Sequence, residues 1–107
     1  MGVTNFENNI LTMIHLMKYH SDGGVLIKRI NTGSYIYCIM VNHTNGVLKY
    51  SVHKTRVNGQ AIGTININKI SIFGMEYDNS KGSLPDSVTI EIMTFHKELM
   101  RRTGNYK

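Results

Sequence analysis

Several of the groups on which protein chemistry usually depends are scarce in this sequence. A single cysteine, Cys38, among 107 residues excludes an internal disulfide framework and indicates a reducing compartment. No stretch approaches eighteen apolar residues, and no basic segment followed by an apolar run stands at the N-terminus. We therefore expect a cytoplasmic protein (in the host cytoplasm if its source is viral) that has no membrane as a partner.

Acidic residues are missing from the middle of the chain. From Gly23 to Met75 there is no Asp or Glu, while the formal net charge of the whole chain is +5. The basic residues of this span are Lys28, Arg29, Lys49, Lys54, Arg56 and Lys69. A surface of one sign attracts anionic partners, although lysines on strands also protect sheet edges from aggregation.

Two Asn-Gly pairs divide the β-rich stretch 35–67. Asn45-Gly46 and Asn58-Gly59 are strong hairpin signals, because both central residues of a type I′ turn need positive φ. If each pair forms a two-residue loop, three strands follow one another as an antiparallel meander. The second loop then places Val57 opposite Gln60.

The two loops sort the side chains of these strands into faces that agree with each other. One face is apolar and consists of Tyr37, Ile39, Val41, Leu48, Tyr50, Val52, Ile65 and Ile67. The other is mainly polar and consists of Cys38, Met40, Asn42, Lys49, Ser51, His53, Thr55, Thr64, Asn66 and Asn68. This alternation is typical of an antiparallel sheet with one buried and one solvated face.

The flanking segments extend this picture. Residues 4–20 predict an amphipathic helix whose apolar stripe is Phe6, Ile10, Met13, Ile14 and Met17. Residues 25–30 predict a further strand. The alternation breaks after Ile67, which predicts a bulge near Asn68-Lys69 or a new strand.

The segment 86–102 fits two structures. Its apolar residues at spacings of four, three and four favour a helix, as do Pro85 at its start and Gly104 beyond its end. A strand over 88–94 followed by a short helix is the alternative, because these residues alternate and are β-branched. With the helix, the fold class is α+β. We expect a single domain over 1–107: an antiparallel meander of four to five strands with an N-terminal and a C-terminal helix on its apolar face.

Candidate catalytic arrangements centre on His53. Cys38 lies opposite it in the predicted register, and a thiol beside an imidazole forms a nucleophilic pair when a third group such as Thr64 or Asn66 orients it. His53-Lys54-Thr55 also matches the His-x-Thr element of two-histidine phosphoesterases, which need two such elements, whereas this chain has one. The five histidines lack metal-ligand spacing and no Gly-rich phosphate loop opens a helix, so we expect no metal and no cofactor.

The polar face and the acid-free span together define a candidate binding surface. Its residues are Arg29, Asn42, Lys49, Ser51, His53, Asn66 and Asn68. We expect a small non-enzymatic protein that binds a larger protein or nucleoprotein complex through this face or a basic sheet edge. Abundant Asn, Ile, Lys and Tyr are typical of AT-rich genomes, so a bacteriophage accessory protein that inhibits a host defence system is one form of this hypothesis.

Three alternatives concern what this surface does. A nucleic-acid-binding domain would use the acid-free span for phosphate contacts, although the tyrosines that could stack on bases lie on the other face. A small phosphoesterase or nucleotide-binding protein would use His53. A homo-oligomer would form if two copies pair their sheet edges.

Overall fold

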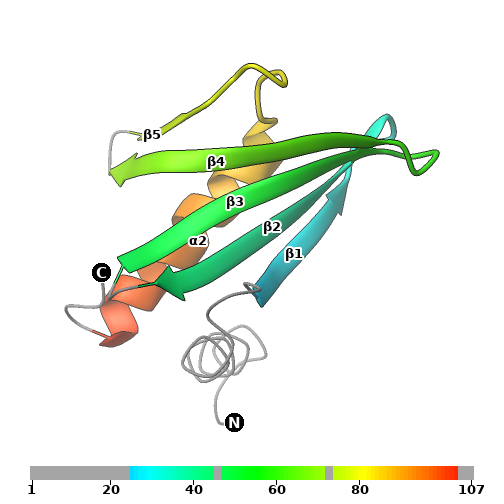
Figure 1. The fold of residues 1–107 in the computed structure, drawn as a ribbon. Helices are drawn as coiled ribbons and strands as arrows, with labels where there is room; N and C mark the ends of the chain where they lie inside the picture. Colours follow the sequence, from blue (N-terminus) through cyan, green and yellow to red (C-terminus); the bar gives the residue numbers. More distant parts are fainter. Residues whose placement is uncertain (1–24, 45–46, 72–73, 104–107) are drawn as a thin grey trace, which may run out of the picture.

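In the part of the chain that the structure describes, a five-stranded antiparallel sheet and one helix form a single α+β domain. The computed structural model describes residues 25–44, 47–71 and 74–103. In sheet order and chain order alike, the strands are β1 (Val25–Asn31), β2 (Tyr35–Thr44), β3 (Val47–Arg56), β4 (Ala61–Ser71) and β5 (Gly74–Tyr77). Helix α2 (Asp86–Thr103) packs on one face of the sheet (Figure 1). The predicted meander and C-terminal helix are confirmed, whereas the predicted helix over 4–20 lies outside the described residues.

The first predicted hairpin has the register that its sequence indicated. Val41 pairs with Tyr50 and Ile39 with Val52 across β2 and β3. The apolar face is buried as predicted: Tyr37, Ile39, Val41, Tyr50, Val52 and Ile65 are buried, and Leu48 and Ile67 pack against them. Alternation with period two therefore sets which side of the sheet becomes the core.

The second hairpin differs from its prediction at the turn. The Arg56 amide donates to the Gln60 carbonyl at 2.8 Å, so the loop contains three residues and Val57 does not face Gln60. Positive φ is needed at Gly59 (φ 99), as in a type I turn that ends in a left-handed residue. The register between β3 and β4 then shifts between Lys54 and Thr55, which leaves one extra residue on β4. Because of this shift, Val52 still pairs with Ile65, as predicted.

Bulges also shape the two outer strand pairs. The register of β4 with β5 shifts between Ile67 and Lys69, which confirms the predicted bulge at this point. The register of β1 with β2 shifts between Leu26 and Lys28. Bulges of this kind bend an edge strand and change the direction of its side chains.

Helix α2 supplies the other half of the core. Val88, Ile92, Phe95 and Leu99 follow the helical spacing and are fully or almost fully buried against the sheet. Each such side chain contributes about 1.5–3 kcal/mol relative to an exposed one. The alternative strand over 88–94 is wrong, because this apolar stripe buries itself only with a period of 3.6 residues.

One of the six basic residues of the acid-free span does not reach the surface. Lys54 lies on the helix side of β3 and is only 8% exposed. Its ammonium group donates to the Lys81 carbonyl at 2.8 Å and lies 4.2 Å from the centre of the Tyr35 ring. Lys54 therefore holds the loop between β5 and α2 against the sheet and contributes no charge to a binding surface.

Candidate functional site

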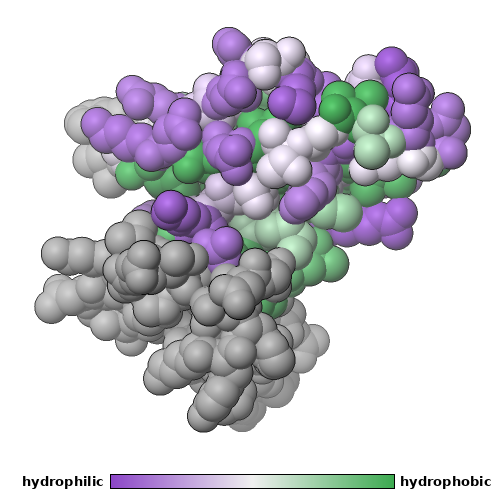
Figure 2. Space-filling view, in the orientation of Figure 1, coloured by the Kyte–Doolittle hydropathy of each residue, from purple (hydrophilic) through white to green (hydrophobic). Residues whose placement is uncertain are grey.

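Among the described residues, no helix or strand covers the face of the sheet opposite α2. In Figure 1 the sheet lies in front of the helix, and Figure 2, in the same orientation, shows hydrophilic and hydrophobic residues mixed on this face. We call it the open face, and define it by the side chains that alternate with the buried set on β1 to β4. Most of the predicted binding residues belong to it.

The centre of the open face is a row of side chains that crosses four strands. Arg29 pairs with Cys38, Cys38 with His53, and His53 with Thr64. Arg29, His53 and Thr64 are exposed, whereas Cys38 is half-buried. The sheet therefore brings residues from β1, β2, β3 and β4 into a line, as the predicted register required.

The neighbouring pairs complete the predicted surface in part. Ser51 pairs with Asn66, and Asn42 pairs with the exposed Lys49. Asn68 is not joined to this group, because the ladder between β3 and β4 ends at Ser51 and Asn66, and Asn68 falls in the bulge beyond it. Six of the seven predicted binding residues thus lie within the paired part of the open face.

Asn42 has an unusual environment for a residue of a solvated face. The residue is half-buried, and its side-chain oxygen Oδ1 is buried without a hydrogen-bond partner among the described residues. A buried polar atom that lacks a partner costs about 1–3 kcal/mol.

His53 forms a hydrogen bond with Thr64 rather than with Cys38, the residue predicted to be its nucleophilic partner. Its Nδ1 atom lies 3.3 Å from the Thr64 hydroxyl, one of the two groups predicted to orient it. Among the hydrogen bonds of the described residues, none joins His53 to Cys38, although the two residues pair in register. A nucleophile and its base need hydrogen-bond contact. Among the described residues, the row therefore lacks the hydrogen-bonded nucleophile and base of such a site.

On β1 and β2 the open face also carries apolar side chains beside Arg29 and Asn42, and the sequence analysis did not identify Leu26 among them. Leu26 pairs with Met40 on this side and is 46% exposed, and Ile36 and Cys38 are half-buried nearby on β2. The sequence signal for Leu26 is weak, because the bulge between Leu26 and Lys28 changes the alternation within β1. Without the register of β1 against β2, Leu26 and Ile27 cannot be assigned to opposite faces.

Charge differs between the two sides of the sheet. On the helix side, Lys28 lies 3.7 Å from the Glu91 carboxylate of α2. On the open side, Arg29 and Lys49 are exposed. Glu76 on the edge strand β5 pairs in register with Lys69 on β4. The described strands β1 to β4 therefore carry basic residues and no acidic ones, and Glu76 on β5 is the acidic residue at the margin.

Other classes of site were searched for in the same residues. Within 25–44, 47–71 and 74–103, no three His, Cys, Asp or Glu side chains gather where they could hold a metal ion. In this part of the chain, no helix combines the length and the apolar character that crossing a bilayer requires. Comparisons with protein-family models, with curated proteins and with solved structures find no match to this chain.

Proposed function

We propose that this protein works by binding a larger protein, or a nucleoprotein complex, through the open face of its sheet. The observation that carries this proposal is that the open face brings the apolar Leu26 and Met40 together with exposed basic and polar side chains, namely Arg29, Lys49 and His53. Protein interfaces likewise combine apolar side chains with arginine and other polar groups.

The partner that fits this surface is acidic and partly apolar. Arg29 and Lys49, both exposed, would pair with carboxylates of the partner. An inhibitor of a host complex, such as a bacteriophage protein directed against a defence system, remains one form of this proposal. The basic sign of the face excludes inhibition by imitation of the DNA backbone, which requires acidic groups.

Nucleic acid is a second candidate partner, supported by the exposed Arg29 and Lys49 and by the acid-free span. Two charges would give modest affinity that falls steeply with salt. The tyrosines of the described strands, Tyr35, Tyr37, Tyr50 and Tyr77, pack against the core and cannot stack on bases from the open face. This arrangement favours a protein partner.

The test is affinity capture from a candidate host lysate with two matched double variants. Lys49→Glu with His53→Glu changes the open face, while Thr94→Glu with Lys97→Glu makes the same charge change on exposed positions of α2. We expect the wild type and the α2 variant to retain the same partner and the open-face variant to lose it at least tenfold. Capture that survives in the open-face variant would overturn the proposal.

Nuclease treatment and a gel shift separate the two kinds of partner. A protein partner should be captured equally from nuclease-treated and untreated lysate. If capture disappears after nuclease, and purified protein shifts a labelled oligonucleotide with a steep salt dependence, the nucleic-acid alternative replaces the protein one.

A further inference from the structure

At the centre of the open face, two long polar side chains stand on either side of a short one. Arg29 and His53 each pair in register with Cys38, from opposite directions. Strands lie about 4.8 Å apart, so about 10 Å separates the Cα atoms of Arg29 and His53. Both are exposed, whereas Cys38 between them is half-buried. The sheet therefore places a guanidinium and an imidazole on the two sides of a short side chain.

The guanidinium of Arg29 forms no ion pair with a described residue. Its neighbour Lys28, on the other side of the strand, lies beside Glu91 of α2. No Asp or Glu stands between residues 23 and 75, so strands β1 to β4 bring no carboxylate to the open face. The charge of Arg29 is therefore available to an anion from outside the described domain.

His53 is held by its neighbour on β4. Its Nδ1 atom lies 3.3 Å from the Thr64 hydroxyl. A hydroxyl that donates to Nδ1 leaves the hydrogen of a neutral imidazole on Nε2, and a protonated imidazole carries one there as well. Among the described residues, no hydrogen bond engages Nε2. The ring thus has an N–H donor to offer in the same row as Arg29.

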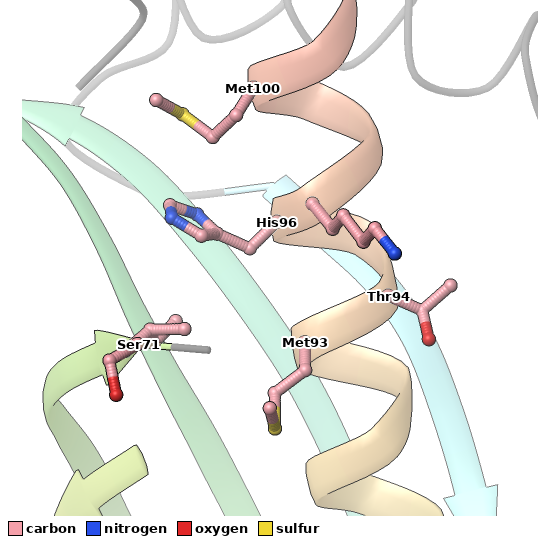
Figure 3. Close-up of a pocket in the computed structure, with 7 residues that line it drawn as sticks. Ser71, Met93, Thr94, His96 and Met100 are labelled. Atoms are coloured by element: carbon pink, nitrogen blue, oxygen red, sulfur yellow. The ribbon is translucent and has the colours of Figure 1, made fainter. Parts of the chain in front are cut away.

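The histidine of α2 does not offer the same donor. Figure 3 shows His96 on the same side of the helix as Met93 and Met100, with Ser71 at the end of β4 across a groove of about 550 Å³. The Nδ1 atom of His96 and the Tyr50 hydroxyl share a hydrogen bond of 2.9 Å, and burial lowers the pKa of this ring from its ordinary value. A neutral imidazole among methionines suits an apolar neighbour, so the open face is the better place for an anion.

We propose that Arg29 and His53 bind a phosphate monoester carried by a side chain of the partner protein. This inference rests on the proposed function, and it replaces the carboxylate expected opposite Arg29 by a phosphate group. A phosphate monoester carries a charge of about −1.5 to −2 and three strong acceptor oxygens. The planar fork of Arg29 bonds two of these oxygens, and the imidazole N–H of His53 bonds the third. Thr64 is a positioning residue, because it acts through the His53 ring.

A phosphate monoester fits these donors better than other anions do. A carboxylate has two oxygens, and a guanidinium fork occupies both, so the imidazole donor would stay unused. A nucleic-acid backbone carries one charge on each phosphate and is bound by basic groups that follow the strand. On the open face, Lys49 lies four positions from His53 along β3, about 13 Å away. A single guanidinium beside one imidazole therefore favours a single, doubly charged group.

A titration of the purified full chain with phenyl phosphate tests the site without a captured partner. We expect saturable shifts in ¹H–¹⁵N spectra centred on the amides of Arg29, Cys38 and His53, and binding of benzoate at least tenfold weaker. Arg29→Gln should weaken phenyl phosphate binding at least tenfold. The control Lys69→Gln removes one exposed positive charge from β4 and should leave this binding unchanged. Equal binding of the two probes, or wild-type binding by Arg29→Gln, would overturn the inference.

Thr64→Val tests the positioning of His53. The change keeps the size of the side chain and removes its hydroxyl, so the affinity for phenyl phosphate should fall by about two- to tenfold, the value of one hydrogen bond. Long-range ¹H–¹⁵N spectra of the imidazole should show its hydrogen on Nε2 in the wild type and a mixture of tautomers in the variant. Unchanged affinity and an unchanged tautomer in the variant would overturn the role of Thr64.

Phosphatase treatment of the lysate connects the site to the partner. In the affinity capture described above, the wild type should capture at least tenfold less partner after phosphatase than after phosphatase with its inhibitor. If capture survives phosphatase but is lost by the open-face variant, the proposed function stands and this inference fails. If nuclease abolishes capture and phosphatase does not, the phosphate belongs to nucleic acid and the inference is overturned. If no partner is captured at all, the proposed function fails, and the phenyl phosphate titration decides the anion site by itself.

Discussion

Replacing the buried Lys54 with methionine tests whether its ammonium group stabilises the fold. The change keeps an unbranched apolar stem and removes the charge. The lost contacts are the hydrogen bond to the Lys81 carbonyl at 2.8 Å and the position of the ammonium over the rings of Tyr35 and Tyr37, at 4.2 and 5.8 Å. Both are made by a residue that is 8% exposed.

The magnitude follows from these contacts. A hydrogen bond from a charged donor contributes about 1.5–3 kcal/mol, and a cation over an aromatic ring about 1 kcal/mol when partly desolvated. Burying the methionine terminus recovers about 1 kcal/mol of transfer energy. We therefore expect Lys54→Met to lower the free energy of unfolding by about 2 kcal/mol and the Tm by about 8 °C.

Urea unfolding followed by circular dichroism measures this difference, with Lys49→Met as the control. Lys49 is on the same strand but exposed, so its replacement should change the free energy of unfolding by less than about 0.5 kcal/mol. Hydrogen exchange should also accelerate at the Gly82 amide, which donates to Asn79 within the loop that Lys54 holds. A Lys54→Met protein as stable as the wild type would show that desolvation cancels the contacts of the ammonium group, and would refute this reasoning.

Two further predictions concern α2. Leu99→Ala should lower the free energy of unfolding by about 2–5 kcal/mol, because Leu99 is 0% exposed. Ile90→Ala is the control: Ile90 is 61% exposed, so its replacement should change the free energy of unfolding by less than about 0.5 kcal/mol. Similar changes for the two variants in urea titrations would contradict the assigned helix face. Burial holds the pKa of His96 below its ordinary value of 6.5, so the folded chain binds that proton less readily than the unfolded chain. The wild type should therefore lose stability as the pH falls from about 6.5, and His96→Gln should lose less; identical profiles would show that His96 is not the group responsible.

Much of the fold could be predicted because apolar alternation and turn residues agreed over β2, β3 and β4. The buried and open faces, the bulge after Ile67 and the helix after Pro85 all follow from local patterns. The contacts that sequence could not reveal are between elements far apart in the chain. The Tyr50–His96 hydrogen bond joins residues separated by 46 positions, and only the packing of α2 on β3 brings them together.

The candidate surface was predictable to the same extent and for the same reason. Lys49, His53 and Asn66 share the open face because the register of two hairpins places them there. Lys54 was counted among the basic residues of the span, yet its position in the alternation already assigns it to the buried side. The Lys81 carbonyl and the Tyr35 ring accommodate the ammonium group of Lys54 on the buried side. No local sequence pattern indicates that these two groups lie beside Lys54.

The second hairpin shows which signal controls register when two compete. A three-residue loop ending in Gly59 changes the pairing by one residue, which alone would turn Ile65 toward solvent and Asn66 into the core. Burying Ile65 contributes about 1.5–3 kcal/mol, and an unpaired buried amide costs a similar amount, so the correct face is favoured by several kcal/mol. An extra residue beside Gly63, whose φ of 146 suits glycine, absorbs the change within β4. The strand therefore adjusts to the loop, and the apolar pattern, rather than the turn, decides which face of β4 meets α2.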